Sequence, residues 1–230
     1  MNLSIFFPAF NEQLNIESTV QKALDVAKGV KEIGKFEIIV VDDGSIDCTG
    51  EVAERLALEI PEVRVVHHER NRGYGAALKT GFYNSRYEWI VFADSDGQFD
   101  FSEVKKFLAK RNEGDLIIGY RIKRADPFFR KINAVLWGLL PRIFFGLRVR
   151  DLDCGFKLVK KRVIEEIEPL ESDGAFVTTE LLVKAKKRGF IISEVGVHHF
   201  PRSYGLQTGA NIRVIFKAFK GLLSLWKKLC

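Results

Sequence analysis

A short apolar run that ends in two carboxylates decides the fold: Trp89-Ile90-Val91-Phe92-Ala93-Asp94-Ser95-Asp96-Gly97-Gln98. Its apolar part has the length of a buried strand, and a glycine follows, which is typical of a tight turn. Two carboxylates two residues apart at a strand end can reach one divalent cation, directly or through water, while Gly97 lets the backbone turn sharply. The run therefore predicts a strand with a metal site at its carboxyl end.

Two other interpretations of Asp94 and Asp96 have to be weighed. Aspartates after a strand also cap helices. An apolar strand followed by Asp-x-Asp-Gly also opens phosphohydrolases of the haloacid dehalogenase type, in which the first aspartate is the nucleophile. Those enzymes carry the motif on their first strand and follow it with threonine. Here the motif follows the fourth expected strand and is followed by Gln98, which disfavours the phosphohydrolase.

The first half of the chain alternates buried strands with amphipathic helices. The expected strands are short apolar runs: Leu3–Phe7, Phe36–Val41, Val63–Val66, Trp89–Ala93 and Leu116–Ile118. The expected helices lie between them: Glu12–Lys28, Asp47–Glu59, Tyr74–Arg86 and Phe101–Arg111. Asp47 and Ser102 are expected at helix starts. This alternation predicts an α/β fold with one doubly wound, mainly parallel sheet, and 230 residues suffice for a single sizeable core.

Polar residues follow each of the five expected strands, where such sheets bind ligands. These strand ends are rich in carboxylates, arginines and glycines: Pro8–Glu12, Asp42–Ser45, Glu69–Gly73, Asp94–Asp96 and Gly119–Arg121. Because the carboxyl ends of parallel strands share one edge of the sheet, the five turns predict one composite site.

The turn after the third strand contains a glycine-rich run, Asn71–Ala77. It is similar to the dinucleotide fingerprint Gly-x-Gly-x-x-Gly, but Leu78 replaces the third glycine, and the run does not follow the first strand. A dinucleotide-binding dehydrogenase is therefore disfavoured. A glycine-rich helix start remains suited to an anion or to close backbone packing.

Histidines and cysteines carry little functional signal. The pairs His67-His68 and His198-His199 consist of neighbours, which point to opposite faces of a strand, so we expect packing or a single hydrogen bond instead of metal chelation. Cys48, Cys154 and Cys230 are widely separated. They are expected to be free thiols in a reducing cytosol.

The charge is distributed unevenly along the chain. Residues 1–120 carry 14 Lys and Arg against 20 Asp and Glu, whereas residues 121–230 carry 22 against 10. An acidic half followed by a basic half predicts a metal site and a surface that meets anions, with nucleic acid, anionic lipid and phosphorylated substrates as candidates. No signal peptide is expected, and the apolar segment Pro127–Leu147 is broken by Pro141-Arg142, so it is too short to span a bilayer.

The ordered set of strand ends resembles family 2 glycosyltransferases, most closely the polyprenyl-phosphate sugar synthases typified by dolichol-phosphate mannose and glucose synthases. The resemblance covers about residues 3–205 and rests on five motifs in order: Pro8–Glu12, Val41–Ser45, Asn71-x-Gly73, Asp94–Gln98 and Gly119–Arg121. Asp151–Lys157 is similar to the glucose-transferring branch. The mannose branch has a Ser-Lys pair where this chain has Gln207-Thr208, so the donor sugar stays open between GDP-mannose and UDP-glucose types.

The resemblance implies a fold of the nucleotide-sugar glycosyltransferase (GT-A) type and roles for individual residues. Five residues would bind the nucleoside: Pro8, Phe10, Glu12, Val41 and Asp43. Three would hold Mg²⁺ or Mn²⁺ and the diphosphate: Asp94, Asp96 and Gln98. Ser95 would contact the substrate, and Arg121 and Arg202 would stabilise phosphate charge. Arg130 lies where the family receives the lipid phosphate, and Asp151 and Asp153 would shape the acceptor side, so these three join the expected catalytic residues with Asp94, Asp96 and Arg121.

The expected reaction is a metal-dependent, inverting transfer of a hexose from the nucleotide sugar to a polyprenyl or dolichyl monophosphate. A lipid phosphate is already an anion and needs no general base. The alternative acceptor is a saccharide hydroxyl, as in surface polysaccharide synthesis, which needs a carboxylate base such as Asp151, Asp153 or Glu180. A nucleic-acid partner is disfavoured because the cations of the basic half alternate with Phe, Leu and Ile and no recognised motif is present.

The expected organisation is a catalytic domain, residues 1–208, followed by an amphipathic helix, residues 209–230. Residues 1–121 would form the nucleotide-sugar half and residues 122–208 the acceptor half. The helix has a narrow basic stripe formed by Arg213, Lys217, Lys220, Lys227 and Lys228 and a wide apolar face. Such a helix is expected at a membrane interface, with packing on the core or in a dimer as the alternative. The protein is therefore expected to be cytoplasmic and peripheral at the cytoplasmic face of the membrane.

Overall fold

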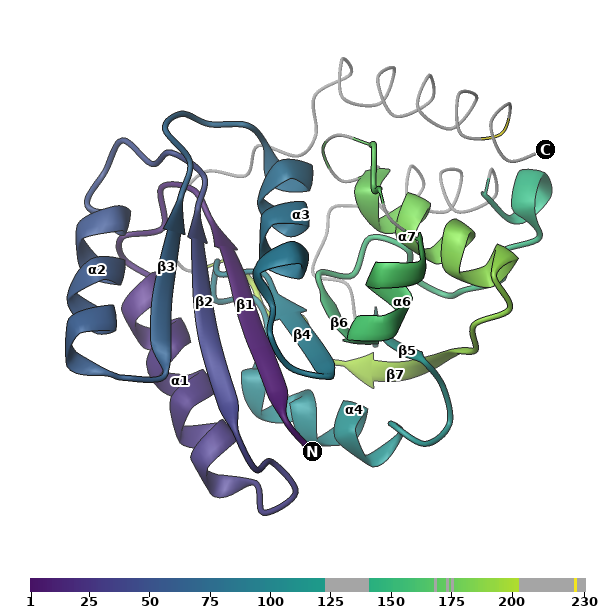
Figure 1. The fold of residues 1–230 in the computed structure, drawn as a ribbon, viewed down its shortest axis with the longest axis horizontal. Coiled ribbons are helices and arrows are strands. Elements are labelled where there is room, and N and C mark those ends of the chain that lie inside the picture. Colours follow the sequence, from purple (N-terminus) through teal and green to yellow (C-terminus); the bar gives the residue numbers. More distant parts are fainter. Residues whose placement is uncertain (123–140, 168, 173, 175, 203–225, 227–230) are drawn as a thin grey trace.

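Seven strands form one sheet in the computed structural model, which describes residues 1–122, 141–167, 169–172, 174, 176–202 and 226 (Figure 1). In chain order the strands are β1 Leu3–Ala9, β2 Phe36–Asp42, β3 Val63–His67, β4 Trp89–Ala93, β5 Leu116–Arg121, β6 Phe156–Lys160 and β7 Ile192–Val197. Their order across the sheet is β3-β2-β1-β4-β6-β5-β7. All five expected strands are confirmed.

Helices follow most of the strands. Their bounds are α1 Ile16–Gly29, α2 Thr49–Glu59, α3 Tyr74–Asn84, the 3₁₀ turn η1 Phe101–Glu103, α4 Val104–Ala109, α6 Lys161–Ile167 and α7 Phe176–Lys187. The four helices expected from the sequence are present. Asp47 accepts from the Thr49 amide at 3.0 Å, as expected at a helix start. The expectation for Ser102 was wrong in detail, because Asp100 caps this segment by accepting from the Ser102 amide at 2.9 Å.

Both faces of the sheet are buried, which is why its strands are continuously apolar. Alternate residues of β1 and β4 enter two separate clusters: Phe7 and Val91 pack with residues of α1, α2 and α4, whereas Phe6 and Phe92 pack with α3, α6 and α7. The expectation of a doubly wound, mainly parallel sheet is confirmed. β6 alone is antiparallel to its neighbours β4 and β5.

The register of β6 matters for the site. Ala93 at the end of β4 lies opposite Phe156 at the start of β6, so the turn that precedes β6 lies at the carboxyl end of β4. In the same way, Arg121 at the end of β5 pairs with Val197 at the end of β7, so the residues after β7 reach this edge too. The sequence did not predict β6 or β7.

Several expectations fall outside the described residues. They concern Arg130, the apolar segment up to residue 140, and all of the C-terminal helix except Trp226. Among the residues that the structure describes, no helix is long and apolar enough to cross a membrane.

Candidate active site

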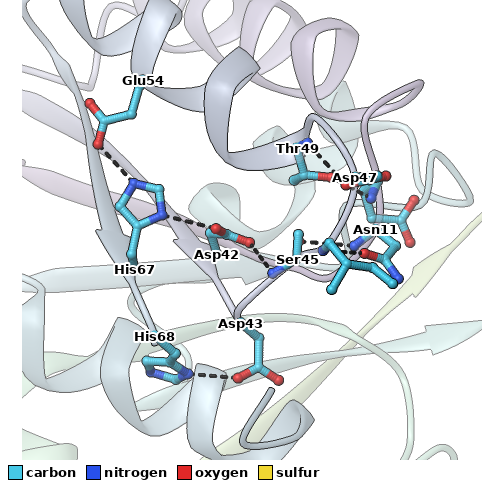
Figure 2. Close-up of polar contacts among 11 residues, drawn as sticks. Asn11, Asp42, Asp43, Ser45, Asp47, Thr49, Glu54, His67 and His68 are labelled. Carbon is cyan, nitrogen blue, oxygen red and sulfur yellow. Dashed lines mark hydrogen bonds and ion pairs between the residues drawn. The ribbon is translucent and has the colours of Figure 1, made fainter. Parts of the chain in front are cut away.

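The turns after β1 and β2 are joined by reciprocal hydrogen bonds (Figure 2). The Asn11 amide donates to Ser45 Oγ at 3.0 Å, and the Ile46 amide donates back to Asn11 Oδ1 at 3.0 Å. Asn11 has a positive φ of 56°, which asparagine tolerates better than most residues. The Glu12 amide adds a bond to Thr49 Oγ1 at 2.8 Å. The two turns therefore form one continuous edge.

The carboxylate of Asp42, the last residue of β2, contacts a chain of polar groups that leads to α2 (Figure 2). Asp42 Oδ2 lies 2.9 Å from His67 Nδ1, and His67 Nε2 lies 2.8 Å from Glu54 Oε1. Partial burial lowers the pKa of His67, but the hydrogen bonds to Asp42 and Glu54 outweigh it and raise the pKa above its ordinary value. His67 thus makes more contacts than the single hydrogen bond expected.

The second carboxylate, Asp43, is buried and points the other way. Its Oδ1 lies 2.6 Å from His68 Nδ1, and His68 Nε2 lies 2.9 Å from Thr80 Oγ1 on α3. Asp43 also accepts from the amides of Arg72 at 2.9 Å and Gly73 at 2.8 Å. Asp43 therefore organises the glycine-rich turn that begins α3.

Asp94 is held from two sides at the end of β4. The Tyr74 hydroxyl donates to Asp94 Oδ1 at 2.8 Å. On the other side Asp94 packs on Gly155, where a Cβ atom would lie 2.0 Å from Asp94 Oδ2. Burial, and next the charge of Asp96, raise the pKa of Asp94 to about 7 despite the hydrogen bond from Tyr74. A cation placed beside these two carboxylates would relieve their mutual repulsion.

Arg202 joins the ends of β1 and β4, although it lies near the end of the described chain. One guanidinium nitrogen contacts Glu12 Oε1, and the other lies 3.6 Å from Asp96 Oδ2. Asn15 Nδ2 donates to the second oxygen of Glu12 at 2.7 Å. Burial nevertheless raises the pKa of Glu12, with Asn15 and Arg202 opposing the shift.

The segment after β7 is attached to the Asp94–Gln98 turn. The Phe200 amide donates to the Gln98 carbonyl at 2.9 Å, and Gln98 Nε2 donates to the Phe200 carbonyl at 2.9 Å. Arg202 is positioned by this pairing, since it lies two residues after Phe200. In the structure, then, the Gln98 side chain bonds the protein's own backbone.

Arg121 and Asp151 form a second charged layer. Arg121 Nε and Asp151 Oδ2 lie 2.7 Å apart, and Arg121 also donates from a terminal nitrogen to Asp151 Oδ1 at 2.9 Å. Lys157 is fully buried nearby and donates to the carbonyls of Leu152 and Cys154. Burial lowers the pKa of Lys157. These bonds fix the turn that places Gly155 against Asp94.

The remaining expected residues differ in how far they can reach a ligand. Phe10 is 39% exposed at the edge of the site, and Asp153 is exposed. Val41 is fully buried, so it can act only by placing the turn that follows it. Ser95 is buried as well, and its hydroxyl donates to the Pro8 carbonyl at 2.7 Å, which ties the end of β4 to β1.

Tyr74, His68, Gly155 and Lys157 were not identified from the sequence as site residues, yet they hold the ones that were. A signal existed for Tyr74, Gly155 and Lys157, since all three lie in motifs singled out above. No pattern in the sequence predicted that the Tyr74 hydroxyl would contact a carboxylate 20 residues further along the chain.

Comparisons with known proteins identify the family of the chain. The family described as Glycosyl transferase family 2 matches residues 4–168. The chain is 30% identical to the polyprenol monophosphomannose synthase of Mycolicibacterium smegmatis, over 91% of this chain and 82% of that protein. It is 30% identical to the dolichyl-phosphate beta-glucosyltransferase of Saccharomyces cerevisiae, over 85% and 66%.

The chain spans only part of some relatives. It is 31% identical to glycosyltransferase AglD of Haloferax volcanii, over 88% of this chain but 34% of that protein. Among solved structures, glucosyl-3-phosphoglycerate synthase from Mycobacterium tuberculosis, in complex with Mn²⁺ and uridine diphosphate, covers 100% of this chain with a TM-score of 0.72 at 20% identity. This likeness confirms the expected GT-A type of fold. The chain belongs to Glycosyl transferase family 2, as the ordered strand-end motifs predicted.

Proposed function

We propose that this protein transfers a hexose from a nucleotide sugar to a polyprenyl monophosphate, with inversion at the anomeric carbon. The observation that carries the proposal is the carboxylate pair Asp94 and Asp96 at the end of β4, with Arg202 contacting Asp96 and Arg121 close enough to oppose the rise that burial causes in the pKa of Asp94. Family membership and relatives named as dolichyl-phosphate and polyprenol-phosphate sugar transferases support the choice of substrates.

The donor set at the end of β4 fits a hard divalent cation. Carboxylate oxygens are the ligands that Mg²⁺ and Mn²⁺ prefer, and the missing side chain at Gly155 leaves the space that Asp94 needs. The proposed site has two carboxylates, and among the described residues no three or more His, Cys, Asp or Glu side chains come together as a metal site. Asp94 and Asp96 would therefore share Mg²⁺ or Mn²⁺ with the donor diphosphate, with Gln98 beside them. The cation would neutralise the leaving diphosphate as the sugar–phosphate bond breaks.

Some of the other site residues would bind the nucleoside, and others would neutralise phosphate charge. The edge formed by Phe10, Glu12 and Asp43 offers a ring and carboxylates to the nucleoside, since carboxylates accept from base or ribose donors. Arg202 and Arg121 would stabilise phosphate charge on the two sides of the reacting centre. The main obstacle in this reaction is the repulsion between two anionic phosphate groups. The arginine side chains would reduce that repulsion. Arg130 would meet the lipid phosphate in the proposal.

A phosphate acceptor is favoured over a hydroxyl acceptor because two of the three candidate bases, Asp151 and Glu180, are held by other protein groups, whereas the third, Asp153, is exposed. Asp151 is engaged by Arg121 through two hydrogen bonds. Glu180 is buried on α7, where it accepts from the Ser172 amide at 2.7 Å and pairs with Lys184 at 2.7 Å. Although burial raises the pKa of Glu180, these partners lower it below its ordinary value, which suits a structural carboxylate better than a general base.

The proposed donor and cation can be identified in one assay. The full chain is incubated with a short polyprenyl phosphate, Mn²⁺ or Mg²⁺, and a panel that includes GDP-mannose and UDP-glucose, and the lipid product is identified by mass. We expect one donor to dominate and chelation of the metal to abolish transfer. Asp96→Ala should remove transfer, whereas Asp25→Asn, an exposed change on α1, should not. Full activity of Asp96→Ala would remove the metal assignment.

Residues 209–230 are proposed to attach the protein peripherally to the cytoplasmic face of a membrane. The support is the basic stripe and wide apolar face in the sequence. Flotation with anionic vesicles compares the full chain with a chain ending at Asn211. The full chain should float and the shortened chain should not; equal flotation would contradict the attachment.

A further inference from the structure

One turn connects the carboxylate after β2 to the carboxylate after β4. Asp43 accepts from the amides of Arg72 and Gly73, at 2.9 and 2.8 Å, and the next residue, Tyr74, donates to Asp94 at 2.8 Å. The contact path from Asp43 to Asp94 therefore runs through three consecutive residues. Asp43 lies on the proposed nucleoside side and Asp94 on the proposed metal side.

The backbone of this turn has little room to move relative to β2. Gly44 has a φ of +68°, and a Cβ there would lie 2.4 Å from the Arg70 carbonyl carbon. Gly73 has a φ of +89°, so Tyr74 starts α3 directly after a conformation that favours glycine. The turns at residues 44 and 70 are thus packed backbone against backbone.

Asp43 is also tied to the body of α3. His68 bridges Asp43 Oδ1, at 2.6 Å, and Thr80 Oγ1 on α3, at 2.9 Å. Tyr74 begins the same helix. The helix that carries the Tyr74 hydroxyl is therefore anchored on Asp43 both at its first residue and through Thr80.

Both carboxylate oxygens of Asp94 are in contact with the protein. The Tyr74 hydroxyl binds one oxygen, and the backbone of Gly155 lies against the other, where even a Cβ would come within 2.0 Å. A shift of Tyr74 therefore changes how Asp94 presents its oxygens to a cation. Groups that orient a metal ligand in this way commonly contribute roughly 10- to 100-fold to metal affinity.

We propose that Tyr74 is a positioning residue, through which the Asp43-bound turn sets the orientation of Asp94 and thereby couples the nucleoside side of the site to the metal side. The inference rests on the proposed function, because it takes Asp94 as a metal ligand. It assigns Asp43 a second role, which is independent of any contact with the donor: Asp43 supports metal binding before the nucleotide arrives.

The test measures Mn²⁺ affinity of the full chain by electron paramagnetic resonance, with no nucleotide present. Tyr74→Phe and Asp43→Asn should each weaken Mn²⁺ binding about tenfold, and the double variant should also weaken it about tenfold because both changes break one path. Asp42→Asn is the matched control: it removes the same charge one residue away, but Asp42 contacts His67 and Ser45, not this turn. Its Mn²⁺ affinity should stay within about twofold of the wild type.

The outcomes separate this inference from the proposed function. If the wild type binds no Mn²⁺ even with UDP or GDP present, the metal assignment fails and the inference fails with it. If the wild type binds Mn²⁺ but Tyr74→Phe and Asp43→Asn bind equally well, only the inference is overturned. Independent losses that multiply to about 100-fold in the double variant also overturn the coupling. Should Asp43→Asn fail to fold, Tyr74→Phe alone decides: unchanged Mn²⁺ affinity in that variant overturns the inference.

Discussion

The backbone of Gly155 lies directly against the carboxylate of Asp94, so that a Cβ atom at position 155 would stand 2.0 Å from Asp94 Oδ2 and 2.4 Å from its carboxyl carbon. The Asp94 amide also donates to the Gly155 carbonyl at 3.1 Å. The two residues come together because β6 is antiparallel to β4 and begins where β4 ends. A glycine at 155 is thus required by the Asp94 side chain and not by its own backbone angles.

Gly155→Ala should abolish sugar transfer while the protein stays folded. The added methyl group cannot be accommodated without turning the Asp94 carboxylate away, so we expect Mn²⁺ affinity to fall at least about tenfold. Gly29→Ala at the end of α1 is the control, since a Cβ there meets nothing within 4 Å. Calorimetric melting and Mn²⁺ titration of both variants check this. Normal metal binding by Gly155→Ala would show that Asp94 is not a ligand.

Asp94→Asn should stabilise the metal-free protein, and the gain should depend on pH. The folded-state pKa of Asp94, about 7, lies above the ordinary value of 3.8, so the fold favours the protonated carboxyl. The stability that comes from this preference for the protonated carboxyl is fully present below about pH 4 and is lost by the time the pH has risen through about 7. At pH 8 we expect the free energy of unfolding of the variant to exceed that of the wild type by on the order of 2 kcal/mol. This is less than the full pKa shift implies, because Asp94 is only partly buried.

Urea unfolding of the wild type and of Asp94→Asn in a chelator, at pH 4 and pH 8, measures this effect. The side-chain amide oxygen that the substitution introduces can still accept from the Tyr74 hydroxyl, so the comparison isolates the charge. Equal stability differences at the two pH values would contradict the raised pKa of Asp94.

Removal of Arg202 should destabilise the protein through Glu12. Arg202→Met leaves a buried carboxylate without its cation, and breaking such a pair costs about 3 kcal/mol. Glu12→Gln in the same chain removes the unpaired charge, so the double variant should recover part of the loss. Denaturant midpoints of the two single variants and the double variant test this. A double variant as unstable as the sum of the singles would mean that Glu12 and Arg202 act independently.

His67 should make a small, pH-dependent contribution to stability. Its pKa is raised above 6.5 by Asp42 and Glu54 in spite of partial burial. The contribution is therefore fully present below pH 6.5 and is lost as the pH rises through the raised folded-state value. Because the His67 side chain is 41% exposed, we expect the free energies of unfolding of the wild type and His67→Gln to differ by less than about 1 kcal/mol at pH 6. Unfolding curves of both proteins at pH 6 and pH 9 test this, since the difference between them should be present at pH 6 and lost at pH 9. The same difference at both pH values would contradict the prediction.

The sequence predicted the parts of the fold that follow from local periodicity. Strands such as Trp89–Ala93 are short apolar runs, and their polar ends identified the edge on which the site lies. β6 escaped notice because Lys157, a charged residue, is fully buried within it. β7 contains Ser193, Glu194 and Gly196 and has no clear alternation. Burial of a lysine is decided by carbonyl partners that the strand pattern does not contain.

The sequence predicted that residues such as Asp94 and Asp96 would gather at the carboxyl ends of the strands, but it did not predict their contacts. Asp94, Asp96 and Arg202 were expected, whereas the bridge from Arg202 to Glu12 joins positions 190 residues apart. That bridge depends on the pairing of β5 with β7, which carries the segment after β7 across the sheet edge. The contact between Tyr74 and Asp94 depends likewise on how α3 leaves its glycine turn. Spacing along the chain holds no information on such tertiary contacts.

The central claim, transfer to a lipid phosphate, is tested most directly by comparing two acceptors that differ only in that phosphate. The full chain is incubated with Mn²⁺, the preferred radiolabelled nucleotide sugar, and either a short polyprenyl phosphate or the corresponding polyprenol, and label in the extracted lipid is counted. We predict a labelled product with the phosphate and none with the alcohol, because the site supplies arginines for a phosphate, whereas Asp151 and Glu180 are held by other protein groups. Label that enters the polyprenol or a saccharide, and not the polyprenyl phosphate, would contradict this account.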